Sequence, residues 1–341
     1  MKNNKDYNLI FEAFRKEEEY TIDYFGRTLG KGAYGEVREV KLKNNIKIMA
    51  AKLLKKEKED DMNEIMVVQD IRGFNIIKIM KTISKRINEE EYVLIIMEKA
   101  SLRDLGKLNE YYNKYNLLKL IKEDVFDEKI GDNLLRFYAK QIIDGLEILD
   151  RNYLVHFDIK PDNLLITLNL IIKISDFSLL TKIKDGDFIN IPGGTVGYLT
   201  PEYYCKEKVS SEIARKQDIF ALGSSLFYLK YGKSLLKYKK DDDPSINMDR
   251  IRDLLFVGDV YIKTRQSTDQ KFINFISSLI KCNPEDRINF EQIYRNEWLN
   301  ANKEVIEDIV HINENDEEKI IMELQKSDYL INKKKVKVKN F

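Results

Sequence analysis

The sequence predicts an α+β fold with two lobes, a small β-rich lobe that carries one main helix and a larger lobe built mainly from helices. Its 341 residues are enough for two domains or for one unit with two lobes. Between Tyr24 and Lys99, short runs of β-branched and aromatic residues dominate, with one helical interruption, EDDMNEIMVVQDI. After Ser101 the apolar residues recur at helical spacing instead.

These changes of pattern divide the chain into three segments. Residues 1–21 form a flanking segment, residues 22–299 form the folded body with lobes of 22–99 and 100–299, and residues 300–341 form a helical extension with a basic tail. The flanking segment contains LIFEAFRKEEEY, which predicts a helix with one apolar face. The residues of that face are Leu9, Ile10, Ala13 and Phe14.

The larger lobe contains a clear helical pattern, GDNLLRFYAKQIIDGLEILDRN, and the body ends near Trp298. Apolar residues at a spacing of three to four along this stretch predict one buried helix face. The residues of this face are Leu134, Leu135, Tyr138, Ile142, Leu146 and Leu149.

The C-terminal extension contains ENDEEKIIMELQKSDYLI, which predicts an amphipathic helix, followed by KKKVKVK. Its apolar stripe is Ile320, Ile321, Leu324 and Leu330. Packing of this stripe on its own lobe is the commoner arrangement, and a regulatory, autoinhibitory contact is the alternative. The basic run is most often a solvated terminus, with contact to an anionic surface as the alternative.

The charge balance argues against a general affinity for nucleic acid or anionic membranes. Lys and Arg number 58 against 57 Asp and Glu, which leaves a net charge of +1. The longest apolar run, YVLIIM, is far shorter than the roughly 20 residues that a membrane helix needs. The two cysteines lack metal-ligand spacing, and the first residues are too charged for a signal peptide. We expect a soluble chain without nucleic acid or a membrane span as partners, in the cytoplasm or nucleus.

The stretch LGKGAYGEV, from Leu29 to Val37, places three glycines between two β-like runs. Glycines allow backbone N–H groups to approach phosphate oxygens because no Cβ intervenes. Alone the pattern is weak, since an ordinary hairpin has the same glycines. A dinucleotide site requires a helix directly after the glycines, but Val37–Leu42 has the pattern of a strand.

A lysine lies inside the next apolar strand, IMAAKLL. Lys52 must be exposed on one face or paired with an acid, because burial of an unpaired ammonium is costly. Glu64, in the helical stretch NEIMVVQDI, is the candidate partner. The alternative is two separate surface charges.

The stretch HFDIKPDN brings an aspartate, a lysine and an asparagine close together in Asp158, Lys160 and Asn163. Phosphoryl transfer needs a group to accept a hydroxyl proton, a cation for the γ-phosphate and a metal ligand. Asp176, at the end of the β-like run in KISDFSLL, is a candidate for a second oxygen ligand of Mg²⁺. A polar loop between a helix and a hairpin is the alternative, and the spacing disfavours it.

With these motifs in order, the chain resembles the eukaryotic protein kinases over residues 22 to 299. The motifs that carry the resemblance are LGKGAYGEV, MAAK, EIMVVQDIRGFNII, HFDIKPDN, DFS, GTVGYLTPE, DIFALG and NPEDR. It implies the two-lobed protein kinase fold, ATP and Mg²⁺ as cofactors, and a role for each motif residue. Lys52 would hold the α- and β-phosphates and pair with Glu64, Asp158 would be the base, and Lys160 would contact the γ-phosphate. The implied Mg²⁺ ligands are Asn163 and Asp176.

The resemblance also implies the remaining ATP contacts and three structural features. The glycine loop would contribute Leu29, Gly30, Lys31, Gly32, Ala33, Tyr34 and Gly35, and the adenine hinge Met97, Glu98, Lys99 and Ala100. The adenine ring would lie between Val37, Ala50 and Leu165. An apolar column of Val68, Ile79, His156 and Phe177 would link the lobes above Asp218, and Glu202 would pair with Arg287.

The substrate class also follows from the resemblance. Lys160 and the segment GTVGYLTPE are similar to the serine/threonine branch, since tyrosine kinases generally place Ala or Arg in that part of the loop. Small-molecule kinases with a similar ATP lobe normally lack this segment and the Glu202–Arg287 pair. A protein with a Ser or Thr hydroxyl is therefore the expected substrate. An inactive pseudokinase that serves as a binding scaffold is the alternative, and the retained catalytic groups disfavour it.

The sequence departs from the family pattern in the catalytic loop. Phe157 replaces the arginine that commonly binds an activation-loop phosphate, and residues 182–194 contain no Ser, Thr or Tyr. We therefore expect an active arrangement that does not depend on phosphorylation of this loop, with Phe157 in apolar contact. Ser178 replaces the glycine of the DFG motif, and the Lys52–Glu64 spacing is shorter than usual. Thr200 replaces an alanine, which we expect to be harmless.

Overall fold

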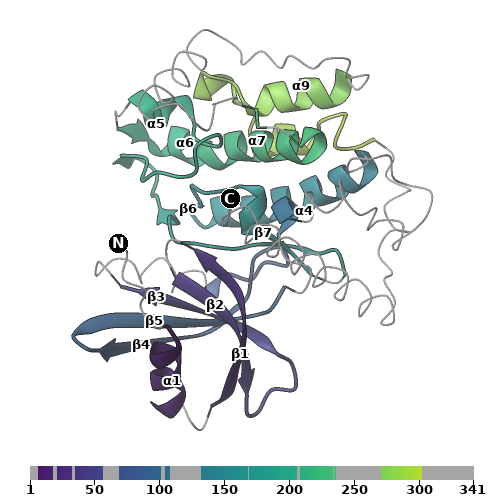
Figure 1. Cartoon of the computed structure of the whole chain (residues 1–341). Coiled ribbons are helices and arrows are strands. Elements are labelled where there is room, and N and C mark those ends of the chain that lie inside the picture. The colour runs from purple at the N-terminus through teal and green to yellow at the C-terminus, as the bar shows by residue number, and fades with distance from the viewer. Residues whose placement is uncertain are drawn as a thin grey trace, which may run out of the picture. The chain divides into compact units, whose positions relative to one another are not determined.

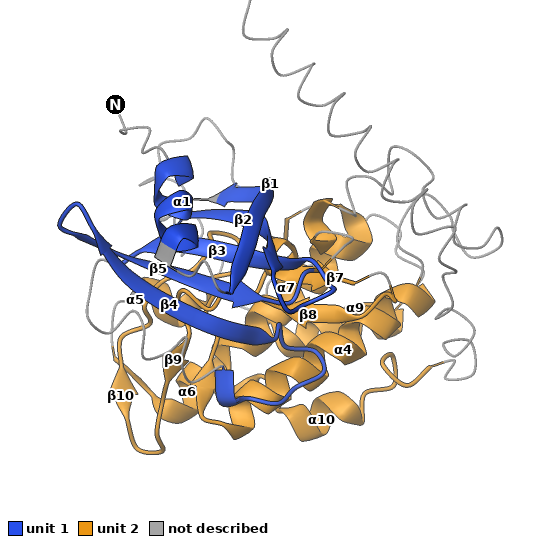
Figure 2. Cartoon of the chain, turned by 90° about the horizontal axis from the view of Figure 1, so that it is seen from below, with its two compact units in different colours: residues 1–99 blue, residues 100–341 orange. Residues whose placement is uncertain are grey.

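The computed structural model describes residues 7–17, 21–32, 35–56, 69–100, 104–107, 132–167, 169–205, 208–232, 234–235 and 270–301. The chain divides into two compact units, Met1–Lys99 and Ala100–Phe341, which Figure 2 shows in different colours. The first unit is rich in strands and the second in helices, which confirms the predicted α+β class.

The first unit contains a five-stranded antiparallel sheet in the order β1-β2-β3-β5-β4 (Figure 1). Its strands are β1 (Ile22–Gly32), β2 (Gly35–Leu42), β3 (Met49–Lys55), β4 (Ile79–Ile87) and β5 (Glu90–Met97). The turn between β4 and β5 places Asn88 and Glu89 at φ values of 48° and 65°. Left-handed angles at both turn residues match the twist of a tight hairpin, which fixes the register of these two strands.

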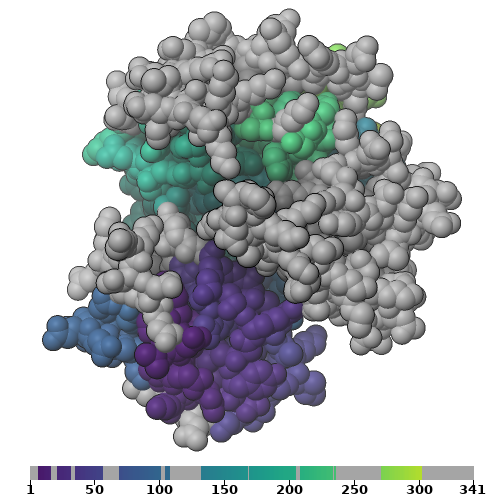
Figure 3. Space-filling view, in the orientation of Figure 1, coloured from purple at the N-terminus to yellow at the C-terminus, as the bar shows by residue number. Residues whose placement is uncertain are grey.

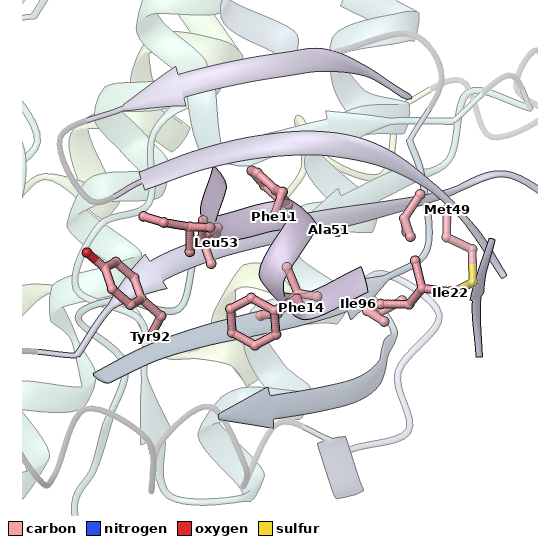
Figure 4. Packing of buried hydrophobic residues seen from close by; sticks show 11 residues of the cluster. Phe11, Phe14, Ile22, Met49, Ala51, Leu53, Tyr92 and Ile96 are labelled. Atoms are coloured by element: carbon pink, nitrogen blue, oxygen red, sulfur yellow. The ribbon is translucent and has the colours of Figure 1, made fainter. Parts of the chain in front are cut away.

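Helix α1 (Tyr7–Glu17) covers one face of this sheet, as Figure 4 shows. The predicted helix is confirmed, but its predicted face was wrong at one position. Leu9 is 70% exposed, whereas Phe11 and Phe14 are fully buried among residues of the strands. Phe11 meets Phe25 edge to face at 4.8 Å, and these rings bury more apolar area than Leu9 offers.

Part of the main helix predicted for the first unit lies outside the described residues. Gln69 and Asp70 are helical, while Glu64 and Val68 are among the residues that the structure does not describe. The predicted pairing of Lys52 with Glu64 and the place of Val68 in the apolar column therefore stay predictions.

The second unit is built on α4 (Asp132–Arg151), α7 (Gln217–Tyr231) and α9 (Gln270–Leu279). Its shorter helices are α5 (Pro201–Cys205), α6 (Ser211–Arg215), α10 (Phe290–Tyr294) and the 3₁₀ turns η3 (Pro161–Asn163) and η4 (Pro284–Asp286). Within the described residues, three short antiparallel strand pairs accompany them. They are β6 (Leu154–Val155) with β9 (Thr181–Lys182), β7 (Leu164–Ile166) with β8 (Ile172–Ile174), and β10 (Phe188–Ile189) with β11 (Val209–Ser210).

Helix α4 buries the whole face that the sequence predicts, from Leu134 to Leu149. Trp298, near which the sequence predicts the end of the body, is fully buried and stacks on Phe275 at 5.3 Å between ring centroids. Arg136 of α4 donates from Nε to the Trp298 carbonyl at 2.9 Å, which ties the chain at Trp298 to this helix. Among the described residues, no helix combines the length and the apolar character that crossing a membrane requires.

Candidate active site

Asp158 lies in the loop between β6 and η3, and three side chains donate hydrogen bonds to it. Lys160 Nζ lies 2.6 Å from Asp158 Oδ2, and the Thr195 hydroxyl donates to Oδ1 at 2.6 Å. Lys160 also donates to the Thr195 hydroxyl at 2.6 Å. Asp158 is 7% exposed, so these contacts form where competition from water is weak. Asp158, Lys160 and Thr195 therefore form a closed ring of three hydrogen bonds.

Asn163, at the end of η3, completes the surroundings of Asp158. Its Nδ2 donates to the Asp158 backbone oxygen at 2.7 Å and to Oδ2 at 3.0 Å. Oδ2 therefore accepts two bonds in these contacts and Oδ1 accepts one, and a carboxylate oxygen has about two acceptor directions. One direction on Oδ1 is left for a further donor such as a substrate hydroxyl.

The pairing of β7 with β8 joins the backbone at Asn163 to the backbone just before Asp176. Leu164 lies opposite Ile174, and both the backbone N and the hydroxyl of Ser175 donate to the Asn163 carbonyl, at 2.9 and 3.0 Å. Because both amide protons of Asn163 can be used toward Asp158, its side-chain oxygen is the atom left for a metal. One carboxylate and one amide oxygen fit Mg²⁺, which keeps several ligand positions for water and phosphate.

The segment before Asp158 is anchored on α7 by Asp218. This carboxylate accepts from the backbone N–H groups of His156 at 2.7 Å and Phe157 at 2.9 Å. Burial raises the pKa of Asp218, and the His156 ring and these two amides oppose the shift without reversing it. The two bonds fix the direction in which the chain enters the catalytic loop.

The His156 ring joins the catalytic loop to the segment that carries Asp176. Its Nδ1 accepts from the Asp158 backbone N–H at 3.2 Å, so Nε2 carries the proton and donates to the Ser175 carbonyl at 3.0 Å. The ring also meets Phe177 edge to face at 5.5 Å. His156 and Phe177 of the predicted column are therefore in contact, and Ile79 is buried within the first unit.

Two residues of this region have left-handed backbone angles although they are not glycines. Phe157 has φ of 63° and Asp176 has φ of 64°. Such a conformation costs about 1–3 kcal/mol and persists only where the surroundings hold it. The Asp218 bonds provide that hold at Phe157.

Phe157 belongs to an apolar cluster of buried residues. It is 6% exposed and packs with Val155, Ile183, Val209 and Ala214. The partly buried residues against this cluster are Leu179, Ile189, Ile191 and Ile213. Since Ile183, Ile189 and Ile191 belong to the segment after Asp176, the cluster joins that segment to the catalytic loop.

The first unit gathers its predicted ATP-binding residues on the sheet face opposite α1. Lys52 lies opposite Val37 in the β2–β3 register, and Ala50 lies opposite Met97 in the β3–β5 register. Directly opposed residues project from the same face, while Ala51 and Leu53 alternate toward α1. Each unit thus carries its own set of the predicted residues.

The glycines of the loop between β1 and β2 have different structural roles. Gly35 has φ of 154°, and a Cβ there would lie 1.9 Å from the Leu53 carbonyl oxygen. At Gly30 a Cβ would meet no described heavy atom within 4 Å. The close approach of β2 to β3 therefore requires glycine at position 35. At position 30, neither the packing of the sheet nor the φ angle requires glycine. Ala33 and Tyr34 lie outside the described residues.

The remaining residues that the sequence predicts as ATP contacts make the following interactions. Leu29 is 38% exposed, and Leu165 forms a bridge with Asp104. Glu98 accepts from the Lys78 N–H at 2.7 Å, and Lys99 Nζ lies 2.9 Å from Glu39 Oε1. The side chain of Lys99 is therefore engaged with β2.

The predicted pair of Glu202 and Arg287 is present and buried. Arg287 also donates from Nε to the Lys281 carbonyl at 2.7 Å, and burial lowers its pKa despite the pairing with Glu202. Thr200 is bonded through its hydroxyl to Gln217 of α7. Threonine at position 200 therefore makes a contact that alanine lacks, and the expectation that this change is harmless stays a prediction.

Sequence reasoning did not assign Thr195 and Ser175 to the site. Thr195 was visible in the motif GTVGYLTPE, but its contact with Asp158 joins residues 37 positions apart. Ser175 directly precedes Asp176, and its bonds to Asn163 depend on the β7–β8 hairpin.

Comparison with known proteins relates this arrangement to one family. The protein kinase domain matches residues 24–299. The chain is 28% identical over 287 residues to the probable serine/threonine-protein kinase MARK-C of Dictyostelium discoideum, covering 82% of this chain and 34% of that protein. It is 26% identical over 214 residues to the serine/threonine-protein kinase MRCK beta of Rattus norvegicus, covering 61% of this chain and 12% of that protein. The chain thus spans about a third or less of the length of these relatives. Since the matching domain extends over most of the sequence, the chain belongs to the protein kinase domain family.

Proposed function

We propose that the chain is a serine/threonine protein kinase that uses Mg²⁺ and ATP to phosphorylate protein hydroxyl groups. The observation that carries the proposal is the ring of Asp158, Lys160 and Thr195, completed by Asn163. Residues 22–299 are the proposed kinase domain, with segments 1–21 and 300–341 beside it, and the family match over 24–299 supports these limits.

In this proposal Asp158 receives the proton of the substrate hydroxyl at the remaining direction on Oδ1. Thr195, Lys160 and Asn163 hold the carboxylate in one orientation, which supplies the positioning that phosphoryl transfer requires. Bound Mg²⁺ would neutralise phosphate charge, and Asn163 and Asp176 are the residues that would hold it. Lys52, paired with Glu64, would bind the α- and β-phosphates.

The preference for serine and threonine rests on Lys160 and Thr195. Lys160 donates to both Asp158 and Thr195, and in this proposal its ammonium would also neutralise the γ-phosphate of a bound nucleotide. The names of the relatives, serine/threonine-protein kinases, agree with this assignment.

The proposed kinase does not need a phosphate on its activation segment, residues 176–202. What supports this is the Phe157 cluster, in which the residue that replaces the phosphate-binding arginine joins the segment by apolar contact. Ser211 adds two bonds to the segment, from its N–H to the Asp187 carbonyl at 2.9 Å and to its hydroxyl from the Gly186 N–H at 3.2 Å. The Thr195 hydroxyl is already committed to Asp158, so its modification would remove a bond to the base.

The test is transfer of labelled phosphate from MgATP to a basic protein by chain treated with phosphatase. We expect incorporation on serine or threonine, and a fall of about 10²- to 10⁴-fold in Asp158→Asn. Asp162→Asn is the matched control, because Asp162 is an exposed carboxylate of the same loop. Transfer by neither wild type nor variant, with MgATP still bound, would instead indicate a nucleotide-binding scaffold.

A further inference from the structure

Glu36 is a fully buried carboxylate next to the glycine loop, and the proposed chemistry does not use it. It directly follows Gly35 at the start of β2 and lies opposite Lys31 of the loop. Lys31 Nζ is 2.8 Å from Glu36 Oε2, and the Thr28 hydroxyl donates to Oε1 at 3.0 Å. One buried acid therefore holds two residues of the β1 side of the loop.

Arg38 connects this acid to helix α1. Its Nε donates to Glu36 Oε1 at 2.6 Å, and its Nη2 donates to Asn8 Oδ1 of α1 at 2.6 Å. The guanidinium carbon also lies 4.5 Å from the centroid of the Phe11 ring. A guanidinium has a rigid planar fork, so the position of α1 sets the position of the bond to Glu36.

Helix α1 is itself held in one place on the sheet. Phe11 and Phe14 are buried, and Lys85 of β4 donates from Nζ to the Ala13 carbonyl at 2.8 Å. The helix and the strands β1 and β2 lie side by side, and their atoms form one continuous purple surface in Figure 3. A continuous set of contacts therefore leads from α1 through Arg38 and Glu36 to the loop.

The charge of Glu36 is maintained within these contacts. Burial alone raises its pKa, but the hydrogen bonds from Lys31, Arg38 and Thr28 outweigh burial, and the pKa is held below its ordinary value. Because a buried carboxylate that loses one cation is poorly compensated, removal of Arg38 displaces Glu36 and releases Lys31.

We infer that α1 positions the glycine loop on the phosphates of the nucleotide, with Arg38 as the positioning residue that acts through Glu36. The inference rests on the proposed function, since it assumes that the loop covers a nucleotide triphosphate. It predicts an effect confined to phosphates, because Arg38 and Glu36 project from the opposite sheet face to Ala50 and Met97.

The test compares the binding of MgATP and of adenosine to the full chain by calorimetry. We expect Arg38→Met to weaken MgATP about tenfold and adenosine less than about twofold, because one charge-assisted bond to the loop acid is lost. Asn8→Ala removes only the exposed hydrogen bond between α1 and Arg38. We expect it to weaken MgATP binding as well, but by less than Arg38→Met does. Arg15→Met is the control, since Arg15 lies on the same helix and pairs with Glu12.

The outcomes separate the inference from the function on which it rests. Equal weakening of MgATP and adenosine, or no change in either, overturns the role of Arg38. If Arg38→Met does not fold, Asn8→Ala decides the matter by the same ratio of affinities. A wild-type chain that binds adenosine and MgATP equally weakly, or not at all, overturns the proposed function and the inference together.

Discussion

The Thr195 hydroxyl donates a hydrogen bond of 2.6 Å to Oδ1 of Asp158 and accepts one of 2.6 Å from Lys160. Thr195 thus lies between the proposed base and the proposed phosphate-binding cation, and it orients both. Both bonds involve the same hydroxyl group, which alanine removes and serine keeps.

Thr195→Ala should lower kcat by about 10- to 100-fold, because a bond to a charged group is worth about 1.5–3 kcal/mol. Thr195→Ser keeps the hydroxyl and should retain activity within about threefold. The measurement is steady-state phosphate transfer, with Thr181→Ala as control, since the Thr181 hydroxyl bonds the Leu179 carbonyl. Equal kcat values for Thr195→Ala and wild type would show that Thr195 does not orient the base.

Phe157→Arg restores the residue that the family usually carries, and we expect it to be harmful here. The guanidinium would be buried in an apolar cluster, so the free energy of unfolding should fall by about 3–5 kcal/mol. Urea unfolding measures this change. Phe188→Arg is the control, because Phe188 belongs to the same activation segment and is 66% exposed. A stable, more active Phe157→Arg chain would argue that the cluster does not replace an ion pair.

Arg215 should fasten the tip of the activation segment. It donates from Nε to Asp150 Oδ1 at 2.7 Å and from Nη1 to Asp185 Oδ1 at 3.3 Å. Arg215→Met should lower stability by only about 1 kcal/mol, because the pairs are partly solvated. The rate of proteolysis within residues 182–194 should rise by more than the lower free energy of unfolding explains, because the segment opens locally.

The matched control is Arg151→Met, since Arg151 is 71% exposed and pairs with Glu147 on the neighbouring turn of α4. Limited proteolysis with identification of the cleaved bonds distinguishes the two variants. Identical cleavage patterns would mean that Arg215 does not hold the segment.

Glu36 should make the stability of the chain depend on pH in the acid range. Its folded-state pKa lies below the ordinary value of 4.5, so the native state binds the proton more weakly than the unfolded state. The stabilisation is therefore complete above the ordinary pKa and is lost as pH falls through the lower folded-state pKa. Glu36→Gln should be less stable than wild type at pH 7, and the two should converge in acid.

Melting temperatures of both chains between about pH 3 and 7 measure this convergence. Glu12→Gln is the control, because Glu12 is an exposed acid that pairs with Arg15. A constant difference between the Glu36→Gln and wild-type curves would exclude titration of Glu36 as the cause.

The sequence was sufficient where a motif lies within one short loop. Asp158, Lys160 and Asn163 are five positions apart at most, so their spacing alone predicts a shared site. The buried face of α4 was equally predictable, because every residue of the face obeys one helical period.

Local sequence patterns did not predict the contacts between residues that are far apart in the chain. The choice of Phe11 over Leu9 depends on the position of Phe25 on the sheet, and both residues fit the helical period. The burial of Glu36 depends on an arginine of the same strand and a lysine across the hairpin, whereas a lone glutamate in a hairpin is normally solvated. Local sequence contains neither of these partnerships.

The 1.9 Å separation that a Cβ at Gly35 would have from the Leu53 oxygen bears on the choice of variants in genetic experiments. A substitution at Gly35 separates β2 from β3, so a cell carrying it lacks folded protein and its phenotype reports abundance. A Cβ at Gly30 meets no described heavy atom within 4 Å, so we expect the chain to fold, and a phenotype of this variant would report on the proposed function of the glycine loop. A variant at Gly30 therefore separates an effect on function from an effect on protein abundance, which a variant at Gly35 cannot do.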